Sequence, residues 1–240
     1  MGAQWKHAGQ AENASKKGAI ISKLVKEITV AAKLGDPNPD NNARLRAAVE
    51  SARKASTPRD TIERAIKKGA GLLDDSVSYE TIVYEGFTPH KVPVIVECLT
   101  DNKNRTAADI RVLFRKAQLG SVGAVGWMFD RMGVVEGTHK DKSMDAESVA
   151  IEAGAQNFEL MEKRETGDDA IGVRFFCDAT DLDSVSKFLI ASGWVITLSE
   201  LSYIAKNSVE LAEVEKKEVV DFLTSIDDHD DVHRIYTALK

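Results

Sequence analysis

The stretch IGVRFFCDATDLDSVSKFLIASGWVITLSELSYIA, residues 171–205, decides the fold of the second half of the chain. Apolar residues alternate with other types over 171–178, which is typical of a half-buried strand. They recur at helical spacing over 182–193, and β-branched and aromatic residues then fill 194–205. These patterns predict a strand, a helix and a second strand, in that order.

Two further elements precede this stretch. GVVEG (133–137) indicates a strand, and MDAESVAIEAG (144–154) indicates a helix. The resulting order of strand, helix, strand, helix and strand is typical of a ferredoxin-like split β-α-β unit. We therefore expect residues 132–205 to form an α+β domain.

The residues before this domain predict a second α+β set. TIVYEGF (81–87), VPVIVECL (92–99) and AVGWMF (124–129) have the composition of strands. Residues 100–117 begin polar and then show the period of a helix. The set therefore contains two strands, a helix and a third strand, and it lacks a second helix and a final strand.

The end of the chain supplies the missing elements. VEKKEVVDFLTSI (214–226) predicts a helix, and VHRIYTAL (232–239) predicts a strand. We expect residues 76–131 and 206–240 to form one discontinuous α+β domain, also ferredoxin-like, into which residues 132–205 are inserted.

Three helices are predicted ahead of these domains. Apolar residues recur at helical spacing over 19–33 and 43–55, and TPRDTIERAIKKG (57–69) forms the third helix. Residues 1–17 show no period and are expected to be a mobile, basic lead-in. Because short helices with narrow apolar stripes must pack on one another, residues 1–75 predict a three-helix domain. The fold class is multidomain, α and α+β.

The third helix carries clear boundary signals. Thr57 is the expected N-cap, Pro58 occupies the first helical position, and Asp60 completes a box-like pattern. Gly69 ends the helix. Thr106 with Asp109 predicts a similar cap for the helix within residues 100–117.

Charge is unevenly distributed along the 240 residues, whose formal net charge is −6. Residues 1–71 carry 14 basic and 7 acidic side chains, whereas the remainder carries 18 and 31. A basic N-terminal third on an acidic body indicates a polyanionic partner for that third. Cys98 and Cys177 lie in apolar runs and are expected to be buried thiols in a reducing, cytoplasmic compartment. We expect neither a signal peptide nor a membrane span.

Several motifs identify a family. TIERAIKKG (61–69), YEGF (84–87), VIVECLTDNKNRTAADIR (94–111) and GWMFDRMG (126–133) resemble the YebC/PmpR family over essentially the whole chain. That family includes mitochondrial translational activators of cytochrome oxidase subunit I. The resemblance implies a helical N-terminal domain and two α+β domains, one interrupted by the other. It also implies a transcriptional regulator or a ribosome-associated translation factor.

Basic side chains of the N-terminal helices are the first candidate site. Guanidinium and ammonium groups neutralise phosphates and release counterions, which suits them to nucleic acid. The alternative is a solvated helix face whose cations pair with Glu27, Glu50, Asp60 and Glu63. Trp5 is expected either to stack on a base or to fold back as an apolar anchor. The candidate phosphate ligands are Lys6, Lys16, Lys17, Lys23, Lys26, Arg44, Arg46, Arg53, Lys54, Arg59, Arg64, Lys67 and Lys68.

DNKNRT (101–106) is the second candidate. Asn102, Asn104, Arg105 and Thr106 are placed to bind a phosphate at a helix N-terminus. The alternative is that Asn104 or Thr106 simply caps the helix. GSVGAVG (120–126) lacks the GK[ST] ending of a nucleotide-binding loop, so close packing of small residues is expected there. DDHDDVH (227–233) combines histidine with aspartates that suit divalent ions, but a solvated acidic turn is the expected structure.

No set of nucleophile, base and acid is recognisable, and no dinucleotide fingerprint is present. We expect no enzyme, cofactor, metal or small-molecule substrate. The predicted function is a monomeric, cytoplasmic regulator of gene expression that binds nucleic acid, either DNA or ribosomal RNA on the ribosome. Nothing in the sequence encodes base readout. The alternative is a non-enzymatic adaptor whose acidic α+β domains bind a basic protein.

Overall fold

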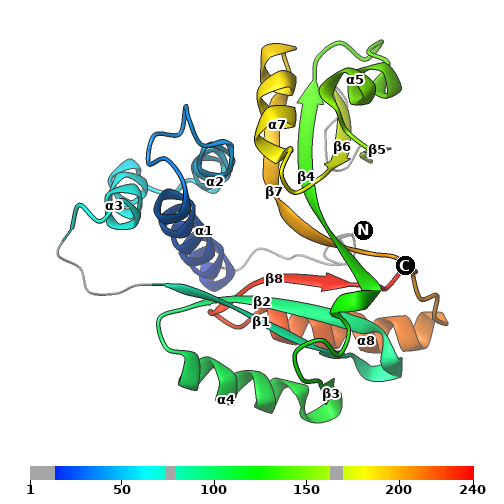
Figure 1. Cartoon of the computed structure of the whole chain (residues 1–240). Helices are drawn as coiled ribbons and strands as arrows, with labels where there is room; N and C mark the ends of the chain where they lie inside the picture. The colour runs from blue at the N-terminus through cyan, green and yellow to red at the C-terminus, as the bar shows by residue number, and fades with distance from the viewer. Residues whose placement is uncertain (1–13, 74–78, 163–169) are drawn as a thin grey trace. The chain divides into compact units, whose positions relative to one another are not determined.

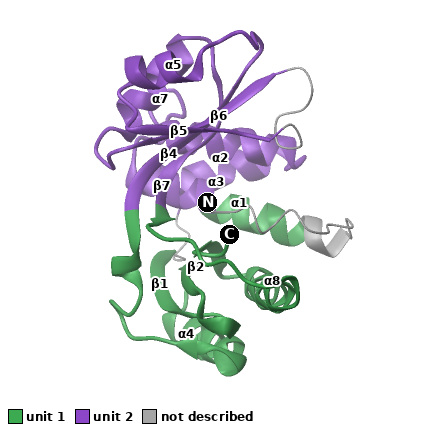
Figure 2. Ribbon diagram, turned by 90° about the vertical axis from the view of Figure 1, so that its right-hand side faces the viewer, with its two compact units in different colours: residues 1–26, 74–130, 203–240 green, residues 27–73, 131–202 purple. Residues whose placement is uncertain are grey.

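The computed structural model describes residues 14–73, 79–162 and 170–240. The chain divides into two compact units, coloured separately in Figure 2. The first unit comprises residues 1–26, 74–130 and 203–240, and the second comprises residues 27–73 and 131–202. Each unit contains one four-stranded sheet. The boundaries of three separate domains stay a prediction.

The sheet of the first unit is antiparallel, with the strand order β3-β1-β2-β8. The helices α4 and α8 lie on one face of this sheet (Figure 1). The helix and strand predicted near the C-terminus are therefore both present, and the last strand pairs with β2. The elements are β1 (Glu80–Phe87), β2 (Pro93–Thr100), α4 (Lys103–Leu113), β3 (Gln118–Leu119), α8 (Glu213–Asp227) and β8 (Val232–Thr237), with 3-10 turns η2 (Pro89–Lys91), η3 (Phe114–Lys116) and η4 (Gly126–Met128).

The core of the first unit lies between this sheet and its two helices. Val94 and Val96 of β2 are completely buried, as is Ile110 of α4. Leu223 and Ile226 of α8 close the same cluster. The apolar stripes that predicted these elements therefore face one another.

The sheet of the second unit has the order β5-β6-β4-β7. Along the chain its elements alternate as β-α-β-β-α-β, which is the ferredoxin-like arrangement. Val135, Val173 and Phe175 of the sheet pack with Val149 of α5 and Leu189 of α7. The predicted ferredoxin-like α+β fold class is thus confirmed. The elements are β4 (Phe129–His139), α5 (Ala146–Ala153), β5 (Asn157–Leu160), β6 (Ile171–Cys177), α7 (Leu182–Ala191) and β7 (Val195–Ala205).

Three helices precede the first sheet: α1 (Ala14–Leu34), α2 (Ala43–Lys54) and α3 (Arg59–Gly69). The C-terminal part of α1, from Glu27 onward, belongs to the second unit together with α2 and α3. Gly69 lets α3 approach α1 closely, because a Cβ atom there would lie 2.3 Å from the carbonyl oxygen of Thr29. Any larger side chain would force the two helices apart.

AVGWMF (124–129) is not a strand, so that prediction was wrong. A 3-10 turn covers Gly126–Met128, and β4 begins only at Phe129. The amides of Val125 and Gly126 donate to the side chain of Glu85 and are unavailable to a strand ladder. The outer strand of the first sheet is instead the short β3, which pairs with β1.

Two other elements differ from the predictions. The strand β5 was missed, because its four residues are too few to establish a period. The helix α1 begins at Ala14 rather than at Ala19, so part of the predicted lead-in is helical.

The N-cap prediction for α3 was also wrong. Pro58 occupies that position without a side-chain cap, and the helix starts at Arg59. Thr57 is only 7% exposed, and its hydroxyl has no hydrogen-bond partner among the described residues. Ser56, which precedes it, has a positive φ of 60°, so a sharp turn leads into the buried position.

Both cysteines are buried free thiols, as predicted. Burial raises the pKa of Cys98 to about 12 and the pKa of Cys177 to about 11. Neither thiol is therefore a nucleophile near neutral pH. Among the described residues, no helix is both long and apolar enough to cross a membrane.

Candidate nucleic-acid interface

The helices α2 and α3 carry the densest group of exposed cations among the predicted sites. Residues 43–69 contain eight basic and three acidic side chains. The apolar face of α3 buries Ile62 and Ala65, so Arg64 and Lys67 emerge on the solvent side. Arg64 and Lys67 are three residues apart and therefore neighbours on the helix surface. Together with Lys54 of α2, they are exposed and form no ion pair within the described part of the chain.

Other cations of these two helices have local partners. Arg53 lies 2.6 Å from Glu50, and Arg59 lies 2.7 Å from Glu63. The hydrogen bond to Glu63 raises the pKa of the Arg59 guanidinium. Because these pairs are exposed, each contributes little to stability and can exchange its carboxylate for a phosphate. Lys68 is half-buried and also interacts within the chain.

Arg44 and Arg46 are held more firmly. Arg44 donates two hydrogen bonds to Glu27, at 2.7 and 3.1 Å, and the Glu27 side chain is only 5% exposed. Arg46 donates to the carbonyl oxygen of Asp40 at 2.5 Å. These two guanidinium groups tie α2 to its surroundings in the fold.

The basic residues of α1 face a different environment. Lys23 pairs with Asp227 at the end of α8, with 3.3 Å between Nζ and Oδ1. Lys26 donates to Asp231 Oδ1 at 2.9 Å and to the carbonyl oxygen of Asp230 at 2.8 Å. Both lysines are therefore neutralised by the acidic turn that was expected to be solvated.

Asp231 is the centre of this network. Its side chain is 4% exposed, and its second oxygen, Oδ2, accepts from Arg105 Nη2 and from Thr106 Oγ1, each at 2.9 Å. Burial alone would raise the pKa of Asp231, but the hydrogen bonds from Arg105, Lys26 and Thr106 outweigh it and hold that pKa well below its ordinary value. The solvated-turn prediction was thus wrong for Asp231, although Asp228 and Asp230 are exposed.

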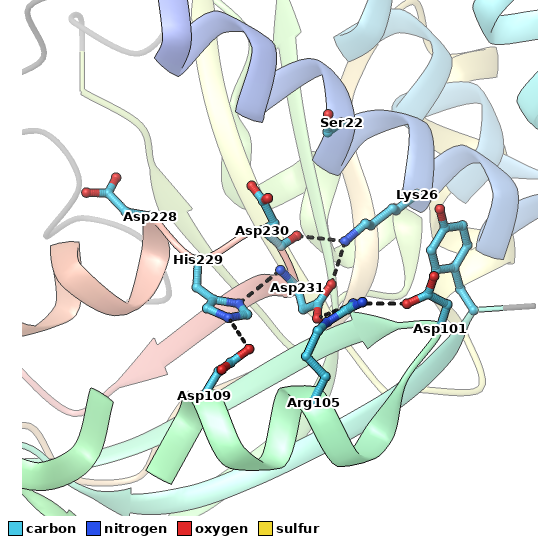
Figure 3. Close-up of a pocket in the computed structure, with 10 residues that line it drawn as sticks. Ser22, Lys26, Asp101, Arg105, Asp109, Asp228, His229, Asp230 and Asp231 are labelled. Atoms are coloured by element: carbon cyan, nitrogen blue, oxygen red, sulfur yellow. Dashed lines mark hydrogen bonds and ion pairs between the residues drawn. The ribbon is translucent and has the colours of Figure 1, made fainter. Parts of the chain in front are cut away.

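An open, acidic cavity of about 650 Å³ lies beside this network (Figure 3). His229 Nδ1 accepts from the amide of Asp231, which leaves Nε2 to donate to Asp109 at 3.2 Å. No group of three or more metal-ligating side chains is found among the described residues. The cavity is lined by Ser22, Lys26, Tyr79, Asp101, Arg105, Asp109, Asp228, His229, Asp230 and Asp231.

The start of α4 differs from the prediction. Neither Thr106 with Asp109 nor Asn104 caps this helix; Asn102 is the N-cap, and its Oδ1 accepts from the amide of Arg105 at 3.1 Å. Thr106 is buried, and its hydroxyl contacts Asp231 Oδ2, Thr100 Oγ1 and the carbonyl oxygen of Asn102. Asn104 is exposed in the first turn of α4, and Arg105 bridges Asp101 and Asp231.

Four candidate residues lie wholly or in part outside the described residues. Trp5 and Lys6 lie outside the described residues, and so do the side chains of Lys16 and Lys17, whose backbone belongs to the first turn of α1. The assignment of every candidate to nucleic acid stays a prediction.

Sequence reasoning missed Glu85 and Trp127. Glu85 braces the loop between β3 and β4, and Trp127 is 67% exposed on that loop.

The fold and the exposed basic helices define a multidomain α+β protein with a helical N-terminal segment. Two family models match the chain: one described as the TACO1/YebC protein N-terminal domain over residues 2–72, and one described as the TACO1/YebC second and third domain over residues 79–239. The chain belongs to the TACO1/YebC family. The predicted resemblance is therefore confirmed.

Relatives cover the whole chain. A probable transcriptional regulatory protein of Bdellovibrio bacteriovorus is 51% identical, over 100% of both chains. Another from Pseudomonas savastanoi pv. phaseolicola is 50% identical, over 100% of this chain and 99% of the relative. The crystal structure of a conserved hypothetical protein from Aquifex aeolicus has a TM-score of 0.80 at 34% identity, covering 99% of this chain and 96% of that one. The family is named for regulatory proteins and not for enzymes, as predicted.

Proposed function

We propose that this protein is a nucleic-acid-binding regulator of gene expression, and that exposed cations of α2 and α3 contact phosphates. The observation that carries the proposal is the exposure of Lys54, Arg64 and Lys67 without an internal ion pair among the described residues. Such side chains lose no existing partner when they neutralise a phosphate. The names of the relatives, which are probable transcriptional regulatory proteins, support the same class of function.

Lys23, Lys26 and Arg105 are weaker candidates for phosphate contact. Each would have to leave a carboxylate of its own fold, and the departure of Lys26 or Arg105 would remove a partner from the buried Asp231. A buried carboxylate without its cation is strongly destabilising. We therefore assign these residues to holding α1 and α4 against the end of α8.

A short stretch of RNA with basic proteins beside it suits the charge distribution of this protein better than a long DNA duplex does. The ferredoxin-like part of the second unit, residues 131–202, carries seven basic and fourteen acidic side chains and repels an extended polyanion. A ribosomal site offers RNA to α2 and α3 and basic proteins to the acidic surface. We accordingly favour ribosome-associated, cytoplasmic RNA as the target. Cosedimentation with ribosomes from cells tests this choice, and absence from those fractions together with promoter-specific DNA binding would overturn it.

The phosphate contacts themselves are tested by charge reversal. The triple variant Lys54→Glu, Arg64→Glu, Lys67→Glu should lose on the order of a hundredfold in affinity for RNA at about 0.1 M salt, because about three counterion-releasing contacts become repulsive. A matched control reverses Lys140, Lys187 and Lys217, which are exposed elsewhere and give the same net charge. Equal affinity of the two triple variants would refute an interface on α2 and α3.

The adaptor function makes the opposite prediction. If the acidic α+β surfaces bind a basic protein and the charges of α2 and α3 are incidental, the α2–α3 variant keeps its cellular partners. Purification of both triple variants from cells, followed by comparison of bound RNA and bound protein, separates the two functions.

A further inference from the structure

The outer edge of β1 is only partly paired. On one side, β2 pairs with all eight residues of β1. On the other side, β3 pairs with β1 at Gly86 and Phe87 alone. Residues 80–84 of β1 therefore form an edge of the first sheet that no other strand of the described chain covers. We call residues 80–84 the open edge.

Two hydrogen bonds show which backbone groups the open edge presents. The amide of Thr88 donates across the turn between β1 and β2 at 2.9 Å, so by alternation the even-numbered residues of β1 bond to β2. The amide of Gly120 donates to the carbonyl oxygen of Glu85 at 2.8 Å, so the odd-numbered residues point outward. The N–H and C=O groups of Thr81 and Val83 therefore also point outward. Among the described residues, these four groups have no hydrogen-bond partner.

The open edge has the composition of a strand that can pair further. Exposed edges are usually protected by proline, by lysine or by a bulge. The open edge reads ETIVY and contains neither proline nor lysine, and its pairing with β2 runs without a register shift. β-Branched and aromatic residues fill every position after Glu80, which favours the extended conformation. An extended peptide complements such an edge, because its backbone supplies the missing donors and acceptors.

The helix α4 runs along β1. Lys103, the first residue of α4, forms an ion pair with Glu80 at the start of β1. Phe114, which directly follows α4, packs against Gly86 near the end of β1, where an added Cβ atom would lie 2.9 Å from the Phe114 ring. These two contacts at opposite ends of α4 place the helix beside the full length of the open edge.

One flank of α4 is cationic and lies toward the open edge. Lys103, Ala107 and Arg111 follow one another at intervals of four residues and share one side of the helix. Arg105 and Asp109 lie on the opposite side, where they contact Asp231 and His229 near the C-terminus. The ion pair of Lys103 with β1 therefore assigns the flank of Lys103 and Arg111 to the side of the open edge.

Arg111 supplies the charge that identifies the occupant. Burial raises the pKa of the Tyr84 hydroxyl and the positive charge of Arg111 opposes that shift, so the guanidinium lies near the open edge. Arg111 is exposed and forms no ion pair in the part of the chain that the structure describes. An added strand with an acidic side chain would pair with it. A second copy of this chain would instead bring its own Arg111 to the same edge, and like charges oppose that pairing.

We propose that an extended, acidic segment of a partner protein adds as a strand to the open edge, in line with β3, and that one of its carboxylates pairs with Arg111. Backbone hydrogen bonds to Thr81 and Val83 supply affinity, and the ion pair selects an acidic segment. This site is distinct from the exposed cations of α2 and α3. The inference goes beyond the proposed function and does not depend on it.

Two blocked peptides test the proposal by NMR. Each alternates valine and threonine over about six residues, a usual strand length, with a central aspartate in one and a central lysine in the other. The aspartate peptide should slow hydrogen exchange at the amides of Thr81 and Val83 and change that of Tyr84, which bonds to β2, much less. The lysine peptide should bind at least about twofold more weakly. Unchanged exchange at Thr81 and Val83 with either peptide at about 1 mM overturns the proposal.

A proline substitution tests the backbone contacts. Thr81→Pro removes one outward donor and no hydrogen bond to β2, and edge strands tolerate proline at such positions. It should lower the affinity for the aspartate peptide by about two- to tenfold. Thr81→Val, which keeps the amide, should bind like wild type, and urea midpoints check that both variants are folded. Equal affinity of folded Thr81→Pro and wild type excludes strand addition at this edge.

A charge reversal tests the choice of an acidic segment and leaves the backbone of β1 untouched. Arg111→Glu should bind the lysine peptide more tightly than the aspartate peptide, the reverse of wild type. The matched control is Arg115→Glu, which reverses an exposed cation beyond the end of α4 and should keep the wild-type preference. An unaltered preference in Arg111→Glu contradicts the role assigned to Arg111.

Other occupants of the open edge would give different results. Exchange at Thr81 and Val83 that slows as protein concentration rises, without peptide, would assign the edge to a second copy of the chain. Protection of the same two amides by oligouridine would assign it to nucleic acid. Either result overturns the proposal. Equal protection by the aspartate peptide in wild type and in the α2–α3 triple variant supports it and shows that it stands apart from the proposed function.

Discussion

Two groups of cations in this protein have similar sequence contexts and different surroundings. Lys23 and Lys26 lie on α1, and Arg105 lies on α4. All three form ion pairs with aspartates near the C-terminus of the chain. Lys54, Arg64 and Lys67 lie on α2 and α3 and remain exposed without ion pairs in the described residues. The difference teaches that a basic block in the sequence is not yet an interface. A basic side chain is available to a nucleic acid only if no carboxylate of the folded protein already pairs with it.

The largest expected effect comes from removing the acceptor of the paired group. Asp231→Ala leaves Lys26 and Arg105 without their shared carboxylate and removes one of the acceptors of the Thr106 hydroxyl. We expect a loss of about 2–4 kcal/mol in the free energy of unfolding, below the full cost of breaking a buried pair because Arg105 is half exposed. Urea denaturation measures it. Asp228→Ala, at an exposed aspartate of the same turn, should change stability by less than about 0.5 kcal/mol.

The same carboxylate predicts a pH dependence. The pKa of Asp231 is lower in the folded protein than in the unfolded chain, where it is about 3.9. The unfolded state therefore binds the proton first as pH falls, and stability that is present above about pH 4 is lost below it. Urea midpoints measured from about pH 6 to about pH 3 should fall less steeply for Asp231→Asn than for wild type. Parallel curves would show that Asp231 is not the group responsible.

Glu85 extends the comparison to a carboxylate held by amides instead of cations. Glu85→Gln keeps one acceptor oxygen, removes the charge and leaves at least one of the three loop amides without its partner. We expect a loss of about 1–2 kcal/mol in unfolding free energy. Hydrogen exchange at Gly123, Val125 and Gly126 should accelerate, while amides of α8 keep their wild-type rates relative to global unfolding. Unchanged exchange at those three amides would contradict the bracing role.

The smallest effect on stability is expected in the exposed group. Arg64→Ala with Lys67→Ala should change the unfolding free energy by less than about 0.5 kcal/mol, because neither side chain has an ion pair to lose. The double variant should instead bind RNA more weakly than wild type. Its RNA affinity should also fall less steeply as the salt concentration rises. A large loss of stability would mean that these side chains hold the fold together.

Local patterns predicted most of the elements, because each apolar stripe reports on its own helix or strand. The alternation over Ile171–Cys177 and the stripe of α8 are examples that the structure confirms. The strand prediction for AVGWMF (124–129) was wrong for a non-local reason. Its amides are captured by Glu85, which lies about forty residues earlier in the chain.

The candidate site was less predictable than the fold. Lys26 and Asp231 are 205 residues apart, and no local pattern links them. Nothing in the sequence around Lys26 distinguishes it from Lys67, since both lie on basic, amphipathic helices. Only the three-dimensional arrangement shows that one ammonium group meets a buried carboxylate and that the other remains exposed.

The most direct test of the central claim is the salt dependence of RNA binding by two matched variants. One replaces Lys54, Arg64 and Lys67 with alanine. The other replaces Lys23, Lys26 and Arg105 with methionine in an Asp231→Asn background, so that no buried carboxylate is left without its cation. The account predicts that the first reduces the slope of log affinity against log salt by about two to three, and that the second leaves the slope of the folded protein unchanged. A reduced slope in the second variant with a wild-type slope in the first would contradict it.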